Sequence, residues 1–115
     1  MDRVVCKLGD LNEYQLFIKK YKYVLIKAGA TWCGPCQRIK ELFNSLAYKM
    51  PEEFVVGLID IDDAQSIKRK LNIKSVPYFA TIINGEVADV LVGSDEKQIQ
   101  GLFNKCKKAV GYGES

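Results

Sequence analysis

Two nearly continuous apolar stretches, separated by a helical pattern, constrain the fold of this 115-residue chain more than any other feature. Residues Tyr23–Gly29 and Phe54–Asp62 have the composition of strands that are buried on both faces. Between them, apolar residues recur at helical spacing before Pro51; they are Ile39, Leu42, Phe43, Leu46, Ala47 and Met50. This strand–helix–strand order predicts two parallel strands joined by a crossover helix.

Further elements are predicted on both sides of this unit. Residues Val4–Leu8 predict a short strand. A helix is expected to start at Asp10, with Glu13 placed as in a capping box. Another helix is expected to open at Asp63. Its inward residues would be Ala64, Ile67 and Leu71.

The last third of the chain predicts a β-hairpin followed by a helix. Two strand-like runs, 78–83 and 87–92, flank Asn84-Gly85, which is the strongest short signal for a hairpin turn. The final helix is expected near Ser94-Asp95, with Ile99, Leu102, Phe103 and Cys106 on its apolar side. The predicted order is βαβαβαββα, an α/β fold with a mixed central sheet and helices on both faces.

Composition excludes several classes of protein. A content of 48% apolar and 27% charged residues suits a single globular domain, expected over 1–110 with a short flexible tail at 111–115. The net charge of +3 is weak and spread along the chain, so nucleic-acid binding is not expected. No stretch approaches the 18 apolar residues of a membrane span, and the N-terminus lacks the core of a signal peptide. We therefore expect a cytoplasmic protein in a reducing compartment.

Cys33 and Cys36 stand three residues apart, and three roles are possible for such a pair. A structural zinc site needs four ligands, but the chain has no histidine, and Cys6 and Cys106 each lie alone in a predicted strand or helix. A structural disulfide closing so short a loop would constrain the unfolded chain little. A redox centre is the interpretation that uses every feature of the segment, and Cys6 and Cys106 are then interpreted as small apolar residues.

The redox interpretation follows from where the segment lies. Cys33 is expected at the junction of a strand and a helix, where free N–H groups stabilise a thiolate. Cys36 lies one helical turn further and can resolve a mixed disulfide. Pro35 suits an early helical position, and Gly34 allows a substrate chain to approach closely. Trp32 supplies an apolar wall beside the exposed sulfur.

The segment Ala30–Cys36, Ala-Thr-Trp-Cys-Gly-Pro-Cys, resembles the active site of the thioredoxin family. Residues Ser75–Phe79, Asn84–Glu86 and Leu91–Ser94 are similar to the cis-proline segment, the hairpin turn and the glycine loop of that family. The likeness covers nearly the whole chain and is closer to eukaryotic-type cytosolic thioredoxins than to bacterial ones. It implies the thioredoxin fold and an enzyme that reduces protein disulfides, in which the Cys33 thiolate attacks and Cys36 resolves the mixed disulfide.

The resemblance also implies a substrate groove and partners. Val76 would offer backbone hydrogen bonds to an extended substrate, and Pro77 would be cis, with its ring against the two sulfurs. Tyr78 and Gly93 would border the groove, together with the residues around the cysteines. The implied partners are disulfide-containing substrate proteins and a thioredoxin reductase. A monomer without bound metal or cofactor is expected, and NADPH would act only through the reductase.

The sequence departs from the family at Lys27, where an aspartate is usual, and at Leu58, where the family often has a lysine. In one interpretation, Lys27 extends its ammonium to water or pairs with Asp60 or Asp62. In the other, a partly buried ammonium lies near the sulfurs and lowers their pKa, which would make the disulfide a stronger oxidant. An oxidant or isomerase is therefore one alternative function. A separate alternative, of another class, is a binding subunit of the same fold without catalysis.

A second departure concerns the active-site helix. The family often has a kinking proline five residues after the second cysteine, and this chain has Glu41 there. A straighter helix is therefore predicted.

Overall fold

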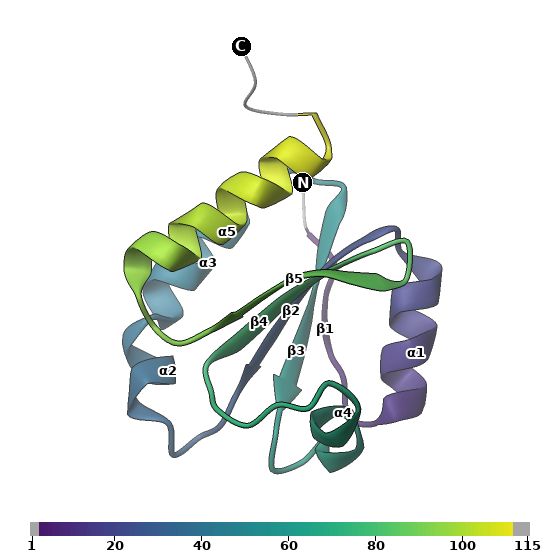
Figure 1. Cartoon of the computed structure of the whole chain (residues 1–115), viewed down its shortest axis with the longest axis vertical. Coiled ribbons are helices and arrows are strands. Elements are labelled where there is room, and N and C mark those ends of the chain that lie inside the picture. Colours follow the sequence, from purple (N-terminus) through teal and green to yellow (C-terminus); the bar gives the residue numbers. More distant parts are fainter. Residues whose placement is uncertain (1–2, 112–115) are drawn as a thin grey trace.

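The computed structural model describes residues 3–111, which form one sheet with helices on both faces (Figure 1). In chain order the elements are β1 (Val5–Lys7), α1 (Leu11–Lys20), β2 (Tyr23–Gly29), α2 (Gly34–Arg38), α3 (Lys40–Lys49), β3 (Phe54–Asp60), α4 (Gln65–Lys70), β4 (Tyr78–Ile83), β5 (Glu86–Val92) and α5 (Glu96–Ala109). Apart from Gly111, the predicted tail 111–115 lies outside the described residues.

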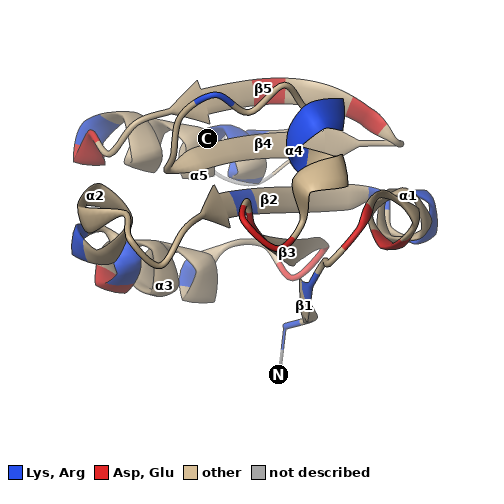
Figure 2. Ribbon diagram, turned by 90° about the horizontal axis from the view of Figure 1, so that it is seen from below, with Lys and Arg blue, Asp and Glu red and all other residues tan. Residues whose placement is uncertain are grey.

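The sheet has five strands in the order β1-β3-β2-β4-β5. β1 and β2 both pair with β3 in parallel, β4 is antiparallel to β2, and β5 is antiparallel to β4. The predicted order of elements and the mixed sheet are thus confirmed, with one helix divided into α2 and α3. Figures 1 and 2 show α2, α3 and α5 on one face of the sheet and α1 and α4 on the other.

Alternate residues of the central strands supply two hydrophobic cores, one on each face. Val24, Ile26 and Ala28 of β2 pack in the core on the side of α1 and α4, with Tyr14, Phe17 and Ile67. Leu25 of the same strand packs in the core on the side of α3 and α5, with Phe43, Phe79, Ile99 and Phe103. A strand that alternates between two buried faces has the near-continuous apolar sequence on which its prediction was based.

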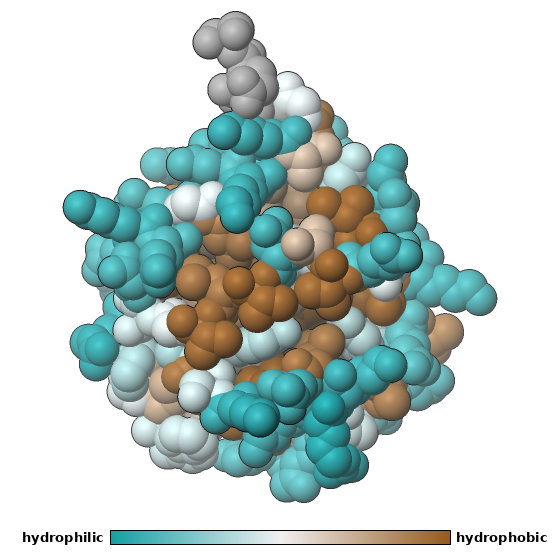
Figure 3. Space-filling view, in the orientation of Figure 1, coloured by the Kyte–Doolittle hydropathy of each residue, from teal (hydrophilic) through white to brown (hydrophobic). Residues whose placement is uncertain are grey.

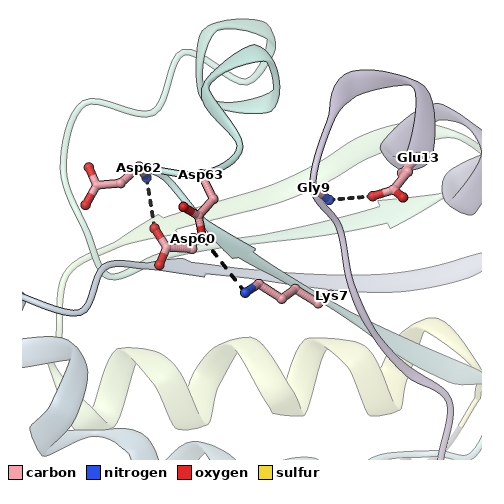
Figure 4. A network of polar contacts seen from close by, with 6 residues as sticks. All are labelled: Lys7, Gly9, Glu13, Asp60, Asp62 and Asp63. Atoms are coloured by element: carbon pink, nitrogen blue, oxygen red, sulfur yellow. Dashed lines mark hydrogen bonds and ion pairs between the residues drawn. The ribbon is translucent and has the colours of Figure 1, made fainter.

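Local capping and turn chemistry follow the sequence. Asp10 accepts a hydrogen bond at 2.9 Å from the backbone N–H of Glu13, and Glu13 in turn accepts one from the N–H of Gly9 (Figure 4). Asn84 and Gly85 have φ of 53° and 80°, the left-handed values that a two-residue hairpin turn requires.

Two predictions about helices are wrong. The active-site helix is interrupted at Ile39, whose φ of −94° and ψ of 3° depart from helical values and separate α2 from α3. Cys36 belongs to the core cluster of α1 and α4, and Ile39 and Phe43 belong to the other. The straighter helix predicted from the absence of a proline is therefore not formed. Asp63 does not open α4: Ala64 is the N-cap, and the Asp63 carboxylate lies 3.9 Å from Lys7 Nζ (Figure 4).

The surface carries an apolar band along the edge strand β5, seen as brown atoms over that strand in Figure 3. Val87, Val90 and Val92 are about half exposed there. Within residues 3–111, no helix is both long enough and apolar enough to cross a membrane.

Candidate active site

Cys33 and Cys36 form a disulfide, with their Cα atoms 5.2 Å apart. Cys33 is the N-cap of α2 and directly follows the loop that leaves β2, while Cys36 lies in the first turn of that helix. The backbone N–H of Cys36 donates to Cys33 Sγ at 3.1 Å. A donor aimed at this sulfur stabilises negative charge on it, so Cys33 is the better-supported thiolate of the two.

The sulfur of Cys33 faces a loop that comes from a distant part of the sequence. The Val76–Pro77 peptide bond is cis, as predicted, and Cys33 Sγ lies 3.7 Å from the carbonyl oxygen of Val76. Gly93 donates its N–H to the carbonyl of Pro77 at 2.9 Å and has φ of 124°, a conformation that favours glycine. The structure thus brings together Cys33, Val76, Pro77 and Gly93.

Cys33 is only 3% exposed and Cys36 6%, so the exposed sulfur expected beside Trp32 is not found; the cis-proline loop and the core cover the pair. The indole of Trp32 is 67% exposed, and its Nε1–H donates to Asp62 Oδ2 at 2.8 Å. Gly34 is exposed, and a Cβ at this position would meet nothing within 4 Å. Asp62 orients the indole, a role that was not predicted for it from the sequence. The acidic residues of Asp60–Asp63, directly after a buried strand, were the sequence feature that could have indicated it.

The predicted contact role of Tyr78 is wrong for its side chain. Tyr78 is 4% exposed and packs in the core on the side of α1 and α4. Burial raises its pKa above the ordinary value of 10. Since this side chain points into the protein, the surface around the disulfide is formed without it.

Lys27 lies on the α3 side of β2, opposite Leu58 of β3 in the sheet. Its Nζ lies 4.7 Å from the centroid of the Phe43 ring, a cation–π contact. No carboxylate of residues 3–111 lies within ion-pair distance of this ammonium. Burial, and secondly the charge of Lys40, lower the pKa of Lys27 below its ordinary range.

The acidic partners suggested for Lys27 are engaged elsewhere. Asp60 Oδ1 accepts the backbone N–H of Asp62 at 2.9 Å (Figure 4), and the carboxylate of Asp62 accepts the indole of Trp32. The interpretation in which Lys27 forms an ion pair with Asp60 or Asp62 is therefore wrong.

Lys27 and Asp60 nevertheless border the same cavity as Cys36. This cavity has a volume of about 290 Å³, and Cys36 forms part of its wall. A Cβ on Gly29 would lie 3.4 Å from Cys36 Sγ, so the glycine leaves this sulfur uncovered on one side. Charged groups in the cavity therefore lie on the side of the Cys36 sulfur.

The part of the chain that the structure describes has no group of three or more His, Cys, Asp or Glu side chains that would hold a metal ion. Cys106 is 1% exposed, as predicted, and burial raises the pKa of its thiol to about 12. Cys6 is partly buried against the core beside α1. Of the four cysteines, Cys33 and Cys36 are joined in a disulfide, whereas Cys6 and Cys106 are free.

Comparison with known proteins agrees with this site. A family model described as Thioredoxin matches residues 5–107. "Thioredoxin H4" of Arabidopsis thaliana is 35% identical over 102 residues, which cover 87% of this chain and 86% of that protein. "Thioredoxin" of Ictalurus punctatus is 33% identical over 107 residues, covering 90% and 100%. A solved structure of Plasmodium falciparum thioredoxin superposes with a TM-score of 0.81 at 27% identity, covering 86% and 96% of the two chains.

Proposed function

Because this chain belongs to the thioredoxin family and is a thiol–disulfide oxidoreductase, we propose that it reduces protein disulfides with Cys33 as the attacking thiol and Cys36 as the resolving thiol. The observation that carries this assignment is the Cys36 N–H aimed at Cys33 Sγ, because it favours the thiolate at Cys33.

The reaction takes place in two exchanges of sulfur–sulfur bonds. The Cys33 thiolate attacks one sulfur of the substrate disulfide, and the other substrate sulfur leaves as a thiolate that takes up a proton. The Cys36 thiolate, formed by loss of its proton, then attacks Cys33 Sγ. The mixed disulfide breaks, and the second substrate thiolate leaves. Two electrons have passed to the substrate, and the protein ends as the Cys33–Cys36 disulfide seen in the structure.

The substrate is proposed to lie as an extended strand over the cis-proline loop. The backbone of Val76 would hydrogen-bond to it, while Pro77 and Gly93 form the floor and Trp32 a side wall. The 3.7 Å separation of Cys33 Sγ from the Val76 carbonyl supports this, since it places backbone hydrogen-bonding groups beside the reacting sulfur.

Lys27 is proposed to stabilise the Cys36 thiolate across the cavity that both residues border. A positive charge in a partly buried site favours the thiolate and therefore the reduced protein. Lys27→Asp should then raise the thiol pKa and make the reduction potential more negative. If both quantities stayed at their wild-type values, Lys27 would have no part in the chemistry.

The recharging partner is proposed to be a thioredoxin reductase that draws electrons from NADPH. Thioredoxins use disulfide substrates and reductases and act without a bound cofactor, so the cysteines carry the electrons themselves. The chain is further proposed to act as a cytoplasmic monomer through a domain at 1–110, without nucleic acid or membrane.

Reduction of a protein disulfide such as that of insulin, driven by dithiothreitol, tests the proposal. Cys33→Ser and Cys36→Ser should each abolish the acceleration, whereas Cys106→Ser, which alters a buried thiol elsewhere, should keep it. Equilibration with glutathione should give a potential near about −270 mV for a reductant. A value near roughly −180 mV would favour the oxidant or isomerase instead, and activity without both cysteines would favour the binding subunit.

A further inference from the structure

The cavity beside Cys36 carries more positive than negative charge. Its wall includes three lysines, Lys7, Lys27 and Lys40, against one carboxylate, that of Asp60. The ammonium of Lys7 lies 3.9 Å from the carboxylate of Asp63, in an exposed pair at the rim. With that pair set aside, the two ammonium groups of Lys27 and Lys40 stand against the one carboxylate of Asp60, which leaves the cavity wall a net charge of +1.

Asp60 offsets one of these two charges without being paired to either lysine. It makes no ion pair with a described lysine, and one of its oxygens is held by the backbone N–H of Asp62 (Figure 4). Lys27 faces the Phe43 ring and is disfavoured as an ammonium by burial and by Lys40. Lys27 is partly buried and Lys40 is exposed. A counterion near both would stabilise the Lys27 ammonium, because it supplies part of the electrostatic stabilisation that burial removes.

We propose that this cavity binds a small inorganic oxyanion, such as phosphate, between the side chains of Lys27 and Lys40. The volume of about 290 Å³ is roughly ten times the ~30 Å³ that a water molecule occupies in the liquid, so an ion fits with part of its hydration. The side-chain amide of Gln37 borders the same space and adds a neutral donor.

A free ion fits this site better than an acidic group carried by a substrate. The cavity wall contains Cys36 but none of the residues proposed for the substrate groove, namely Trp32, Val76, Pro77 and Gly93.

The bound oxyanion has a redox consequence that rests on the proposed function. It lies beside a neutral sulfur when Cys36 is in the disulfide and beside a negative one when Cys36 is a thiolate. Like charges repel, so the ion binds the oxidised protein more tightly than the thiolate form. By linkage, phosphate should then shift the reduction potential to more negative values.

Titration of the oxidised protein with inorganic phosphate, at an ionic strength held constant with chloride, tests the site directly. Backbone amide NMR signals of Gly29, Cys36 and Gln37 should shift and saturate. Lys40→Gln, an exposed side chain whose loss leaves the core intact, should weaken binding roughly tenfold or more, as expected for a lost charged hydrogen bond. Lys27→Met should do the same, and the matched control Lys97→Gln on α5 should bind as wild type.

The proposal is overturned if the shifts do not saturate, or if Lys40→Gln and Lys27→Met bind phosphate as the wild type does. Since binding is measured on the oxidised protein without turnover, a failure of disulfide reduction leaves this result unaffected. Conversely, an empty cavity would leave the activity of Cys33 and Cys36 in place.

Discussion

Gly57 should be the least replaceable glycine of the sheet. It lies in β3, between Cys6 of β1 and Ile26 of β2, and points into the core under α1. A Cβ there would lie 2.8 Å from Ile26 Cδ1, 2.9 Å from Leu8 Cδ1 and 3.3 Å from Phe17 Cε2. The ends of the Ile26 and Leu8 side chains and the buried ring of Phe17 must therefore shift before the methyl group of an alanine fits.

The cost of Gly57→Ala follows from these distances. Overpacking a filled core costs about 1–3 kcal/mol, and the upper part of that range applies if the Phe17 ring also shifts. For a domain of this size, such a loss lowers Tm by about 4 °C or more per kcal/mol. Urea unfolding of the oxidised protein should show the loss as a lower midpoint with an unchanged m-value.

Gly101 supplies a matched control in the same protein. It lies inside α5, and a Cβ there would meet nothing within 4 Å. Gly101→Ala should stabilise the protein by about 0.5–1 kcal/mol, because alanine is the better helix former. The two Gly→Ala changes therefore have opposite predicted signs.

Ile26→Val removes the methyl group nearest the added Cβ and sharpens the test. In the background of Gly57→Ala it should cost less than in the wild type, where it should cost about 0.5–1.5 kcal/mol. The steric argument is refuted if Gly57→Ala leaves the urea midpoint within error of the wild type, or if the double variant is simply additive.

Three further outcomes follow from buried groups. Burial raises the pKa of Tyr14 to about 12 from 10, so the stabilisation from this group is complete below pH 10 and is lost as pH rises toward 12. Between pH 9 and pH 11, the free energy of unfolding of Tyr14→Phe should therefore fall by about 1 kcal/mol less than that of the wild type. Equal falls in the two proteins would contradict this. Cys106 has a thiol pKa of about 12, so at pH 8 it should react with iodoacetamide roughly a thousandfold more slowly in the native protein than in urea. If native Cys106 were labelled as fast as the partly exposed Cys6, the burial of Cys106 would be contradicted. Thr81 is 2% exposed, and its hydroxyl has no hydrogen-bond partner among residues 3–111, so Thr81→Val should raise stability by about 1 kcal/mol in urea unfolding; a loss would show that the hydroxyl is bonded.

Features set by neighbouring residues were predictable from the sequence. The cap at Asp10 and the turn at Asn84-Gly85 depend on chemistry within four residues, and both form as expected. The disulfide pair was predictable for the same reason. The cis bond before Pro77 rested instead on resemblance to a family.

Features that depend on which side of the sheet a residue faces were harder to predict. Tyr78 belongs to a strand that is buried on both faces, so its apolar sequence does not indicate which residues point toward α1. The break at Ile39 arises where a helix passes from one core to the other, and periodicity alone contains no sign of it. The missing acid partner of Lys27 was likewise not predictable, because the sequence shows which acids follow β3 but not their distance from the Lys27 ammonium, and Lys27 forms no ion pair among residues 3–111.

The site needs two neighbouring sulfurs and a loop beside them, and different parts of the fold supply the two. The loop depends on β4, which pairs with β2 and β5. Cys33 and Cys36 are close in sequence, so one turn of chain suffices to bring their sulfurs together. The loop at Val76 is 43 residues from Cys33 and reaches it because β4 runs antiparallel to β2, with Tyr78 opposite Ala28. A partly unfolded chain that had lost the β4–β5 hairpin would keep an oxidisable pair of thiols without the loop that lies beside them. If that loop binds the substrate as proposed, selectivity requires intact tertiary structure, whereas the formation of the disulfide is a local property of four residues.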